Sequence, residues 1–248
     1  MSNDNQKDIS RRDFLKTTGI ATGTLIGGGL IGGLIGYNSK KTAAPSKTNQ
    51  SHSNKTSETS QGKMYFTTDA DFNVLAAATE RIFPKDDLGG GAIDLGVPYF
   101  IDRQLAGQYG SNSKEYMQGP FHDGSPTQGY QTRLTRAEVF SEGVSKLEQE
   151  AQKRYKKGFT DISDKERDVI LTAFQKDKVK MKGVSSAFFF NLLRSATIEG
   201  AYADPLYGGN RNMEGWKMKG FPGHQMSYIN VIEKEGFQKI APKSLGMH

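Results

Sequence analysis

The sequence contains no cysteine among its 248 residues. This absence excludes disulfide bonds, iron–sulfur clusters held by thiolates, a cysteine nucleophile and a zinc site with cysteine ligands within this chain. A chain without cysteine is also suited to the oxidising space outside the cytoplasm. Aromatic side chains include only one tryptophan, Trp216, which makes its surroundings of particular interest.

A strong net charge is likewise missing from the part of the chain that is expected to fold. The whole chain carries 33 Lys and Arg against 27 Asp and Glu, a net charge of +6. Residues 1–62 hold eight basic and four acidic residues (+4), so the remaining 25 basic and 23 acidic residues give only +2. The later residues also form no basic stripe. The charge distribution therefore argues against nucleic-acid binding.

Residues 1–37 have the pattern of a twin-arginine export signal. The pair Arg11-Arg12 stands in the run SRRDFLK, in which Phe14 and Leu15 follow it. An uncharged stretch over 17–37 comes next, with seven Ile or Leu and eight Gly. These glycines keep its hydrophobicity below that of an ordinary membrane-spanning helix, which needs ~20 strongly apolar residues. The pattern predicts export of a folded protein by the twin-arginine translocase, with a plain membrane anchor as the alternative.

Residues 38–63 are expected to form a flexible linker. They are mainly Ser, Thr, Asn, Lys and Gln, and a segment with so few apolar side chains cannot offset the entropy that it would lose on ordering. No A-x-A cleavage site ends the apolar stretch, although small residues occur at 42–44. Two outcomes therefore stay open. The signal is cut near Ala44, or it is kept and holds the protein at the membrane.

Helical signals dominate residues 64–248. Thr135-x-x-Glu138 and Ser163-x-x-Glu166 are capping boxes, in which a hydroxyl and a carboxylate satisfy backbone amides at a helix start. Apolar side chains recur at helical spacing, and no run of four or more residues alternates as a half-buried strand does. We expect a mainly helical single domain with helices over 68–83, 98–107, 135–158, 163–174, 185–199 and 224–235. The helix over 185–199 is expected to be the central buried one.

Two long segments, 110–133 and 200–223, are predicted to be irregular. Irregular segments of this length inside a compact domain usually serve a function. The second one alternates aromatic, Gly and Pro residues with single polar groups. Its glycines at 208 and 209 can turn the chain sharply, and Asp204 and Arg211 are predicted to form a bidentate ion pair that fixes the segment.

We interpret the 200–223 segment as a candidate contact surface for a partner protein. Trp216 beside Phe221 has the rigid amphipathic character of side chains that anchor interfaces. The alternative is that the segment packs on its own domain, with Trp216 as a core side chain. A third reading is an exported sugar-binding module that uses the aromatic faces of Trp216 and Tyr207. The candidate contact residues are Tyr202, Asp204, Tyr207, Asn210, Arg211, Trp216 and Phe221.

No catalytic or metal-binding constellation can be recognised in the sequence. The chain has no phosphate-binding glycine motif, no H-E-x-x-H and no G-x-S-x-G. Asp86, Asp87 and Asp94 lack the spacing of an oxygen-ligand metal loop. A self-sufficient metal-dependent enzyme that uses Asp86, Asp204 and His224 is kept as an alternative. Our expectation is that this chain holds no catalytic residue, no metal and no cofactor.

Two blocks of sequence carry a resemblance to a known family. The first is FPKDDLGGGAIDLGVPYFIDRQLAG, residues 83–107, and the second is GAYADPLYGGNRNMEGWKMKGFPG, residues 200–223. With these blocks the chain resembles the gluconate 2-dehydrogenase subunit 3 family over about residues 68–235. The second block is long and specific, and it coincides with the candidate contact surface.

The resemblance implies a non-catalytic small subunit of a membrane-associated dehydrogenase that oxidises a sugar or sugar acid. In such complexes the catalytic partner is a separate FAD-containing chain of the glucose-methanol-choline oxidoreductase type, and some complexes add a cytochrome c. The small subunit supports maturation and export of that partner. The protein is then expected at the outer face of the cytoplasmic membrane or in the periplasm, with segments 86–107 and 200–223 as its contact surface.

Overall fold

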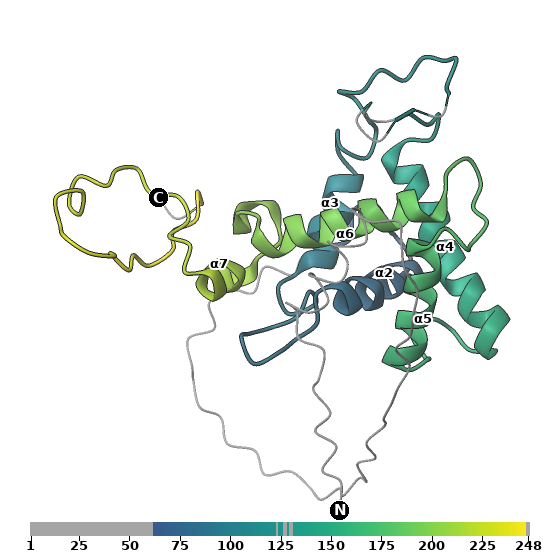
Figure 1. The fold of residues 1–248 in the computed structure, drawn as a ribbon, viewed down its shortest axis with the longest axis horizontal. Coiled ribbons are helices and arrows are strands. Elements are labelled where there is room, and N and C mark those ends of the chain that lie inside the picture. The colour runs from purple at the N-terminus through teal and green to yellow at the C-terminus, as the bar shows by residue number, and fades with distance from the viewer. Residues whose placement is uncertain (1–61, 123, 126–127, 129–130, 247–248) are drawn as a thin grey trace, which may run out of the picture. The chain divides into compact units, whose positions relative to one another are not determined.

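The computed structural model describes residues 62–122, 124–125, 128 and 131–246. The predicted export signal, and all but the end of the predicted linker, lie outside these described residues. The described residues belong to one compact unit, Gln61–His248, and they contain helices but no strands (Figure 1). The expectation of a mainly helical single domain is confirmed. The α-helices are α2 (Asp69–Ile82), α3 (Val97–Leu105), α4 (Arg136–Tyr155), α5 (Asp164–Gln175), α6 (Ser186–Tyr202) and α7 (Glu214–Lys219).

The helices begin at the caps that the sequence encodes. Thr68 and Ser185 each accept a hydrogen bond from the backbone N–H three residues later, at the starts of α2 and α6. Thr135 and Ser163 both form the complete capping box, and the Thr135 amide donates to the Glu138 carboxylate at 2.7 Å. Such caps satisfy amides that the helix itself leaves unpaired. None of the helices in the described part is both long and apolar enough to cross a bilayer.

Helix α6 is the centre of the domain, as the sequence predicts. It contacts all the other α-helices of the described part (Figure 1). The Phe189 ring on α6 is fully buried and meets two further buried rings edge-on, Phe140 of α4 at 5.7 Å and Phe174 of α5 at 5.8 Å between centroids. Edge-to-face rings at these distances add stabilisation to that of burial itself. This three-ring cluster therefore fixes the mutual position of α4, α5 and α6.

Gly143 is the position on α4 where this cluster leaves no room for a side chain. A Cβ atom there would lie 2.2 Å from the Phe189 ring. We expect Gly143→Ala to lower the free energy of unfolding by about 1–3 kcal/mol, because overpacking a fixed ring outweighs the gain in helix propensity of about 1 kcal/mol. Urea unfolding followed by circular dichroism measures this. Ser145→Ala, on the exposed face of the same helix, is the control, and equal stability of Gly143→Ala and the wild type would contradict the packing.

Asp102 ties the beginning of the described chain to α3. Its carboxylate is 1% exposed and accepts hydrogen bonds from three successive backbone amides, those of Met64 (2.5 Å), Tyr65 (3.1 Å) and Phe66 (2.7 Å). The phenol of Tyr65 continues to α4, where it donates to the Ala137 carbonyl at 3.0 Å. The segment that precedes α2 is thus fixed by an internal carboxylate. The sequence signals for helices did not reveal this contact.

The prediction of a helix over 224–235 is wrong. The structure has an open loop there, with isolated turns such as the one closed by the Val231 amide and the Tyr228 carbonyl at 2.9 Å. A short helix is stable mainly when its apolar face packs on the rest of the protein. Here Ile229 and Ile232 are exposed. Without such packing, helical spacing alone does not produce a helix.

Candidate functional site

The 200–223 segment contains more helix than the sequence predicts. Helix α6 continues to Tyr202, and the chain then forms two short 3-10 helices, η1 (Pro205–Tyr207) and η2 (Arg211–Met213), followed by α7. The Asp204 side chain caps η1 by accepting from the Leu206 amide at 2.9 Å. Gly208, at φ 97°, ends it. The prediction of a wholly irregular segment is therefore wrong. Cap and turn residues also occur in loops, but here they begin and end very short helices.

Asn210 holds the segment together from inside. It is fully buried and lies in the left-handed region at φ 44°. Its side-chain amide donates to the Ala203 carbonyl, and its side-chain oxygen accepts from the Gly215 amide, both at 2.8 Å. Its backbone amide donates to the Gly200 carbonyl at 2.9 Å. Asn210 thus joins the end of α6 to the start of α7, and it positions the surface without belonging to the exposed part.

Two glycines allow the segment to lie directly on the end of α6. A Cβ atom at Gly209 would lie 2.2 Å from the Gly200 carbonyl oxygen, and one at Gly215 would lie 2.0 Å from the Ala201 carbonyl oxygen. Both obstacles are backbone atoms, which cannot rotate away as a side chain can. Only glycine permits this approach of one backbone to another.

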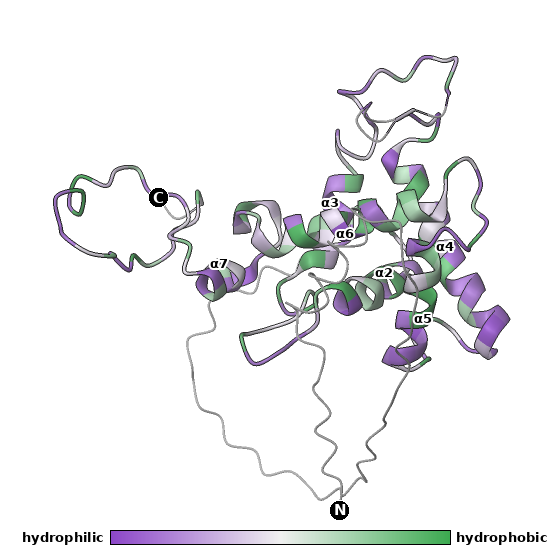
Figure 2. Ribbon diagram, viewed as in Figure 1, coloured by the Kyte–Doolittle hydropathy of each residue, from purple (hydrophilic) through white to green (hydrophobic). Residues whose placement is uncertain are grey.

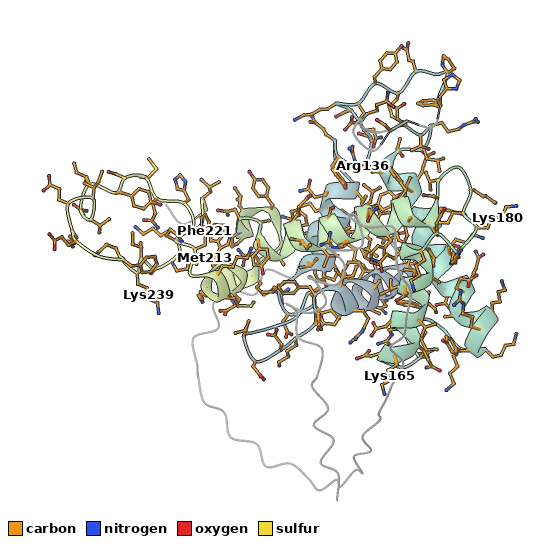
Figure 3. All side chains as sticks on the ribbon, in the orientation of Figure 1. Arg136, Lys165, Lys180, Met213, Phe221 and Lys239 are labelled. Carbon is orange, nitrogen blue, oxygen red and sulfur yellow. The ribbon has the colours of Figure 1, made fainter. Side chains whose placement is uncertain are left out.

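Trp216 packs on its own domain. Its side chain is 6% exposed, and the indole N–H donates to the Tyr202 carbonyl at 2.8 Å. The ring of Phe221 lies against it at 5.4 Å, yet Phe221 itself is 49% exposed at the end of α7 (Figure 3). The self-packing alternative therefore describes the tryptophan. In this arrangement the indole offers no open face for a sugar or a partner, whereas Phe221 does.

The predicted ion pair between Asp204 and Arg211 is wrong. Within the described residues the Asp204 carboxylate accepts from the Ser244 hydroxyl at 2.6 Å and from the Leu245 amide at 2.8 Å. The Arg211 side chain is exposed, and its backbone amide donates to the Leu95 carbonyl at 3.0 Å. The carboxylate is thus satisfied by residues about forty positions away. Nothing in the local sequence indicates that pairing.

Asp204 belongs to a larger closure that we call the C-terminal clasp, in which residues 222–225 are held against 241–245. The Lys243 amide donates to the Pro222 carbonyl at 3.1 Å, and the His224 amide donates to the Lys243 carbonyl at 2.8 Å. Gly223 forms a parallel bridge with Lys243. The clasp closes the loop 224–242 at its base and attaches it to the end of α6.

The clasp is expected to loosen in acid. Burial alone would raise the pKa of Asp204, but hydrogen bonds from Ser244, Leu245 and Leu206 outweigh it and hold the pKa below its ordinary value. A depressed carboxyl pKa gives stability above the ordinary pKa of about 4, and this stability is lost as the pH falls through the lowered value. Exchange of the Leu245 amide should then accelerate several-fold relative to core amides. Asp204→Asn should remove this pH dependence, and an unchanged profile in that variant would contradict the assignment.

A groove brings the two sequence blocks together. It has a volume of 570 Å³. Its lining comes from α3, α6, the connection after α6 and η1: Phe100, Gln104, Ile198, Glu199, Tyr202, Ala203, Asp204 and Tyr207. Burial raises the pKa of the Glu199 carboxyl in this lining, and the guanidinium of Arg136 opposes the shift. Segments 86–107 and 200–223 are therefore neighbours in space. The groove between them combines aromatic, apolar and carboxylate groups.

Two of the carboxylates in these segments, Asp86 and Asp204, accept hydrogen bonds within the fold. Asp86 accepts from the Leu88 amide at 2.8 Å and so caps its own turn. Asp204 is engaged by the clasp. Over the described residues, no three His, Cys, Asp or Glu side chains are grouped so that they could hold a metal ion. The set considered from the sequence, Asp86, Asp204 and His224, forms no such group.

Comparison with known proteins agrees with the sequence blocks. The family model of gluconate 2-dehydrogenase subunit 3 matches residues 69–223, from the start of α2 to the clasp. The match ends before the loop 224–242, so it is shorter than the expected resemblance to about residue 235. No curated protein and no solved structure matches the chain. Because the family model covers more than half of the 248 residues, the chain belongs to the gluconate 2-dehydrogenase subunit 3 family.

Proposed function

We propose that this protein is the non-catalytic small subunit of an exported, FAD-dependent dehydrogenase complex of the gluconate 2-dehydrogenase type. The observation that carries the proposal is the meeting of the two family blocks along one groove, within a chain that belongs to a subunit family. The catalytic partner is a glucose-methanol-choline-type flavoprotein that holds the FAD. In some complexes a cytochrome c accepts the electrons.

The exposed side chains of the two blocks form the contact surface in this proposal. Leu88 and Ile93 come from the first block, and Leu206, Tyr207 and Phe221 come from the second. All five are large, apolar or aromatic, and about half exposed. Such side chains anchor protein interfaces when a partner removes them from water. Arg211 adds an exposed guanidinium, while Tyr202 and Asp204 line the groove and Asn210 and Trp216 support the surface from beneath.

In this proposal the subunit carries the folded flavoprotein across the membrane. FAD is inserted in the cytoplasm, so the flavoprotein must fold there before it crosses the membrane. A twin-arginine signal at Arg11-Arg12 would carry folded cargo, including a flavoprotein bound to the groove. The complex would then work at the outer face of the cytoplasmic membrane or in the periplasm. The stretch over 17–37 would hold it to the membrane if the signal is retained.

Co-expression with the proposed glucose-methanol-choline-type flavoprotein tests this proposal. We expect both chains to elute together from a size-exclusion column with FAD absorbance. Tyr207→Ala with Phe221→Ala should weaken the complex by about 30-fold or more, as loss of interface anchors does. Val169→Ala on α5 removes a similarly exposed apolar side chain away from the groove and is the control. A wild-type chain that elutes alone would refute the proposal.

A further inference from the structure

The loop 224–242 exposes an unusual amount of apolar surface. Met226 is 82% exposed, Ile229 76%, Ile232 75% and Phe237 90%. These are four of the five most exposed large hydrophobic side chains in the described part of the chain. Figure 2 shows apolar stretches along this loop, which extends away from the helices beyond α7. Several large apolar side chains this exposed within one loop indicate a surface that a binding partner covers.

The two ends of the loop are held together at its base. The clasp joins its two ends, and the Gln225 side-chain amide reinforces it by donating to the Pro222 carbonyl at 2.7 Å. Gly223 has φ 66°, and a Cβ atom there would lie 2.3 Å from the Lys243 carbonyl oxygen and 2.5 Å from the Trp216 ring. The clasp thus packs directly on the ring of the buried Trp216. Closing the loop in advance reduces the entropy that binding would otherwise cost.

The loop is continuous with the groove through one residue. Asp204 lines the groove and also accepts the hydrogen bonds of Ser244 and Leu245 that close the clasp. Phe221, an exposed member of the contact surface, directly precedes the first clasp residue, Pro222. A stable interface takes roughly 20–30 residues a side. The loop and the exposed groove residues together supply about that number on a connected surface.

We propose that the loop 224–242 is a docking arm that places Met226, Ile229, Ile232 and Phe237 into an apolar cleft of the flavoprotein subunit. This inference rests on the proposed function and assigns its partner contact to a segment beyond the family match. The charges of the arm favour a protein over a membrane. The arm carries two Glu, at 233 and 235, and two Lys, at 234 and 239, so its acidic and basic side chains balance, whereas segments that bind an anionic lipid surface carry an excess of Lys and Arg.

The full chain with Ile229→Ser, Ile232→Ser and Phe237→Ser tests the arm against the co-expressed flavoprotein. The three side chains touch little of the domain, so the urea midpoint should stay unchanged while affinity for the flavoprotein falls at least 100-fold. The matched control is Val169→Ser, an exposed apolar position on α5, which should bind as the wild type does. If the wild type binds and the triple variant binds within threefold of it, the arm is refuted and the proposed function stands. If the wild type does not bind, the proposed function fails, and the arm with it.

Two further measurements on the same variants test whether a membrane or a second copy of the chain binds the arm instead. Flotation with vesicles of phosphatidylglycerol and phosphatidylethanolamine compares chains that share residues 1–61 and differ only in the arm, so equal flotation is expected. Flotation that depends on the three side chains would identify a membrane as the occupant and overturn the proposal. Light scattering of the chain alone should give the same mass for the wild type and the triple variant. A wild-type dimer that the triple variant abolishes would identify a second copy as the occupant and would likewise overturn it.

Discussion

Replacing Asp102 with alanine is expected to lower the free energy of unfolding by about 3–5 kcal/mol. The substitution removes the acceptor of three successive backbone amides, those of Met64, Tyr65 and Phe66. The site is almost fully buried, so water cannot replace the carboxylate without a rearrangement. The start of the domain should detach from α3, and the amides of these three residues should lose their protection from hydrogen exchange. Urea unfolding gives the loss of free energy directly.

Two control variants make the result specific. Asp102→Asn keeps one acceptor oxygen at nearly the same volume, and we expect it to lose clearly less stability than Asp102→Ala. Asp87→Ala removes an exposed carboxylate from the turn over 86–89, and its effect should stay within about 0.5 kcal/mol. If Asp102→Ala loses less than about 1 kcal/mol, the carboxylate does not hold the chain as described.

Replacing Asn210 with alanine is expected to cost about 2–4 kcal/mol. The Ala203 carbonyl and the Gly215 amide would each lose a hydrogen-bond partner at a buried position. Alanine is also less tolerant than asparagine of the left-handed backbone at φ 44°. Since Asn210 joins the end of α6 to α7, its loss should loosen the groove. Binding of the proposed flavoprotein partner should then weaken, although Asn210 itself is buried.

Asn212 offers a matched control for this effect. It also has a left-handed backbone, at φ 56°, but it is exposed. Asn212→Ala therefore carries the backbone cost of about 1 kcal/mol without the loss of buried hydrogen bonds. The difference between the two variants measures what the Asn210 side chain contributes. Equal losses of unfolding free energy in both variants would show that only the backbone conformation matters. That result would contradict the conclusion that the Asn210 side chain joins α6 to α7.

Local signals in the sequence predict the helices well where packing agrees with them. The caps at Thr135 and Ser163 and the apolar run of α6 lead to helices at the expected places. The same spacing at 224–235 gives no helix, because no other part of the described domain covers its apolar side chains. Helical periodicity thus indicates what a segment is able to form. Tertiary packing decides whether it does so.

The sequence marks the two blocks of the candidate site, but it does not separate the roles of their residues. The resemblance marks both blocks, and the structure places them along one groove. Burial then divides the candidates: Tyr207 and Phe221 face outward, whereas Asn210 and Trp216 support them from inside. The bonds of Asp204 to Ser244 and Leu245 span about forty residues, and no local pattern encodes such a distant contact.

The Arg11-Arg12 pair offers the most direct test of the proposal that this subunit carries the flavoprotein out of the cytoplasm. In cells that express this chain with the proposed flavoprotein partner, the double variant Arg11→Lys and Arg12→Lys should leave both chains in the cytoplasm. The flavoprotein should still contain FAD, because in the proposed function the cofactor is inserted before export. Lys40→Arg with Lys41→Arg in the predicted linker is the control and should export both chains. A flavoprotein that reaches the outer side of the membrane when Arg11 and Arg12 are replaced would contradict the proposed function.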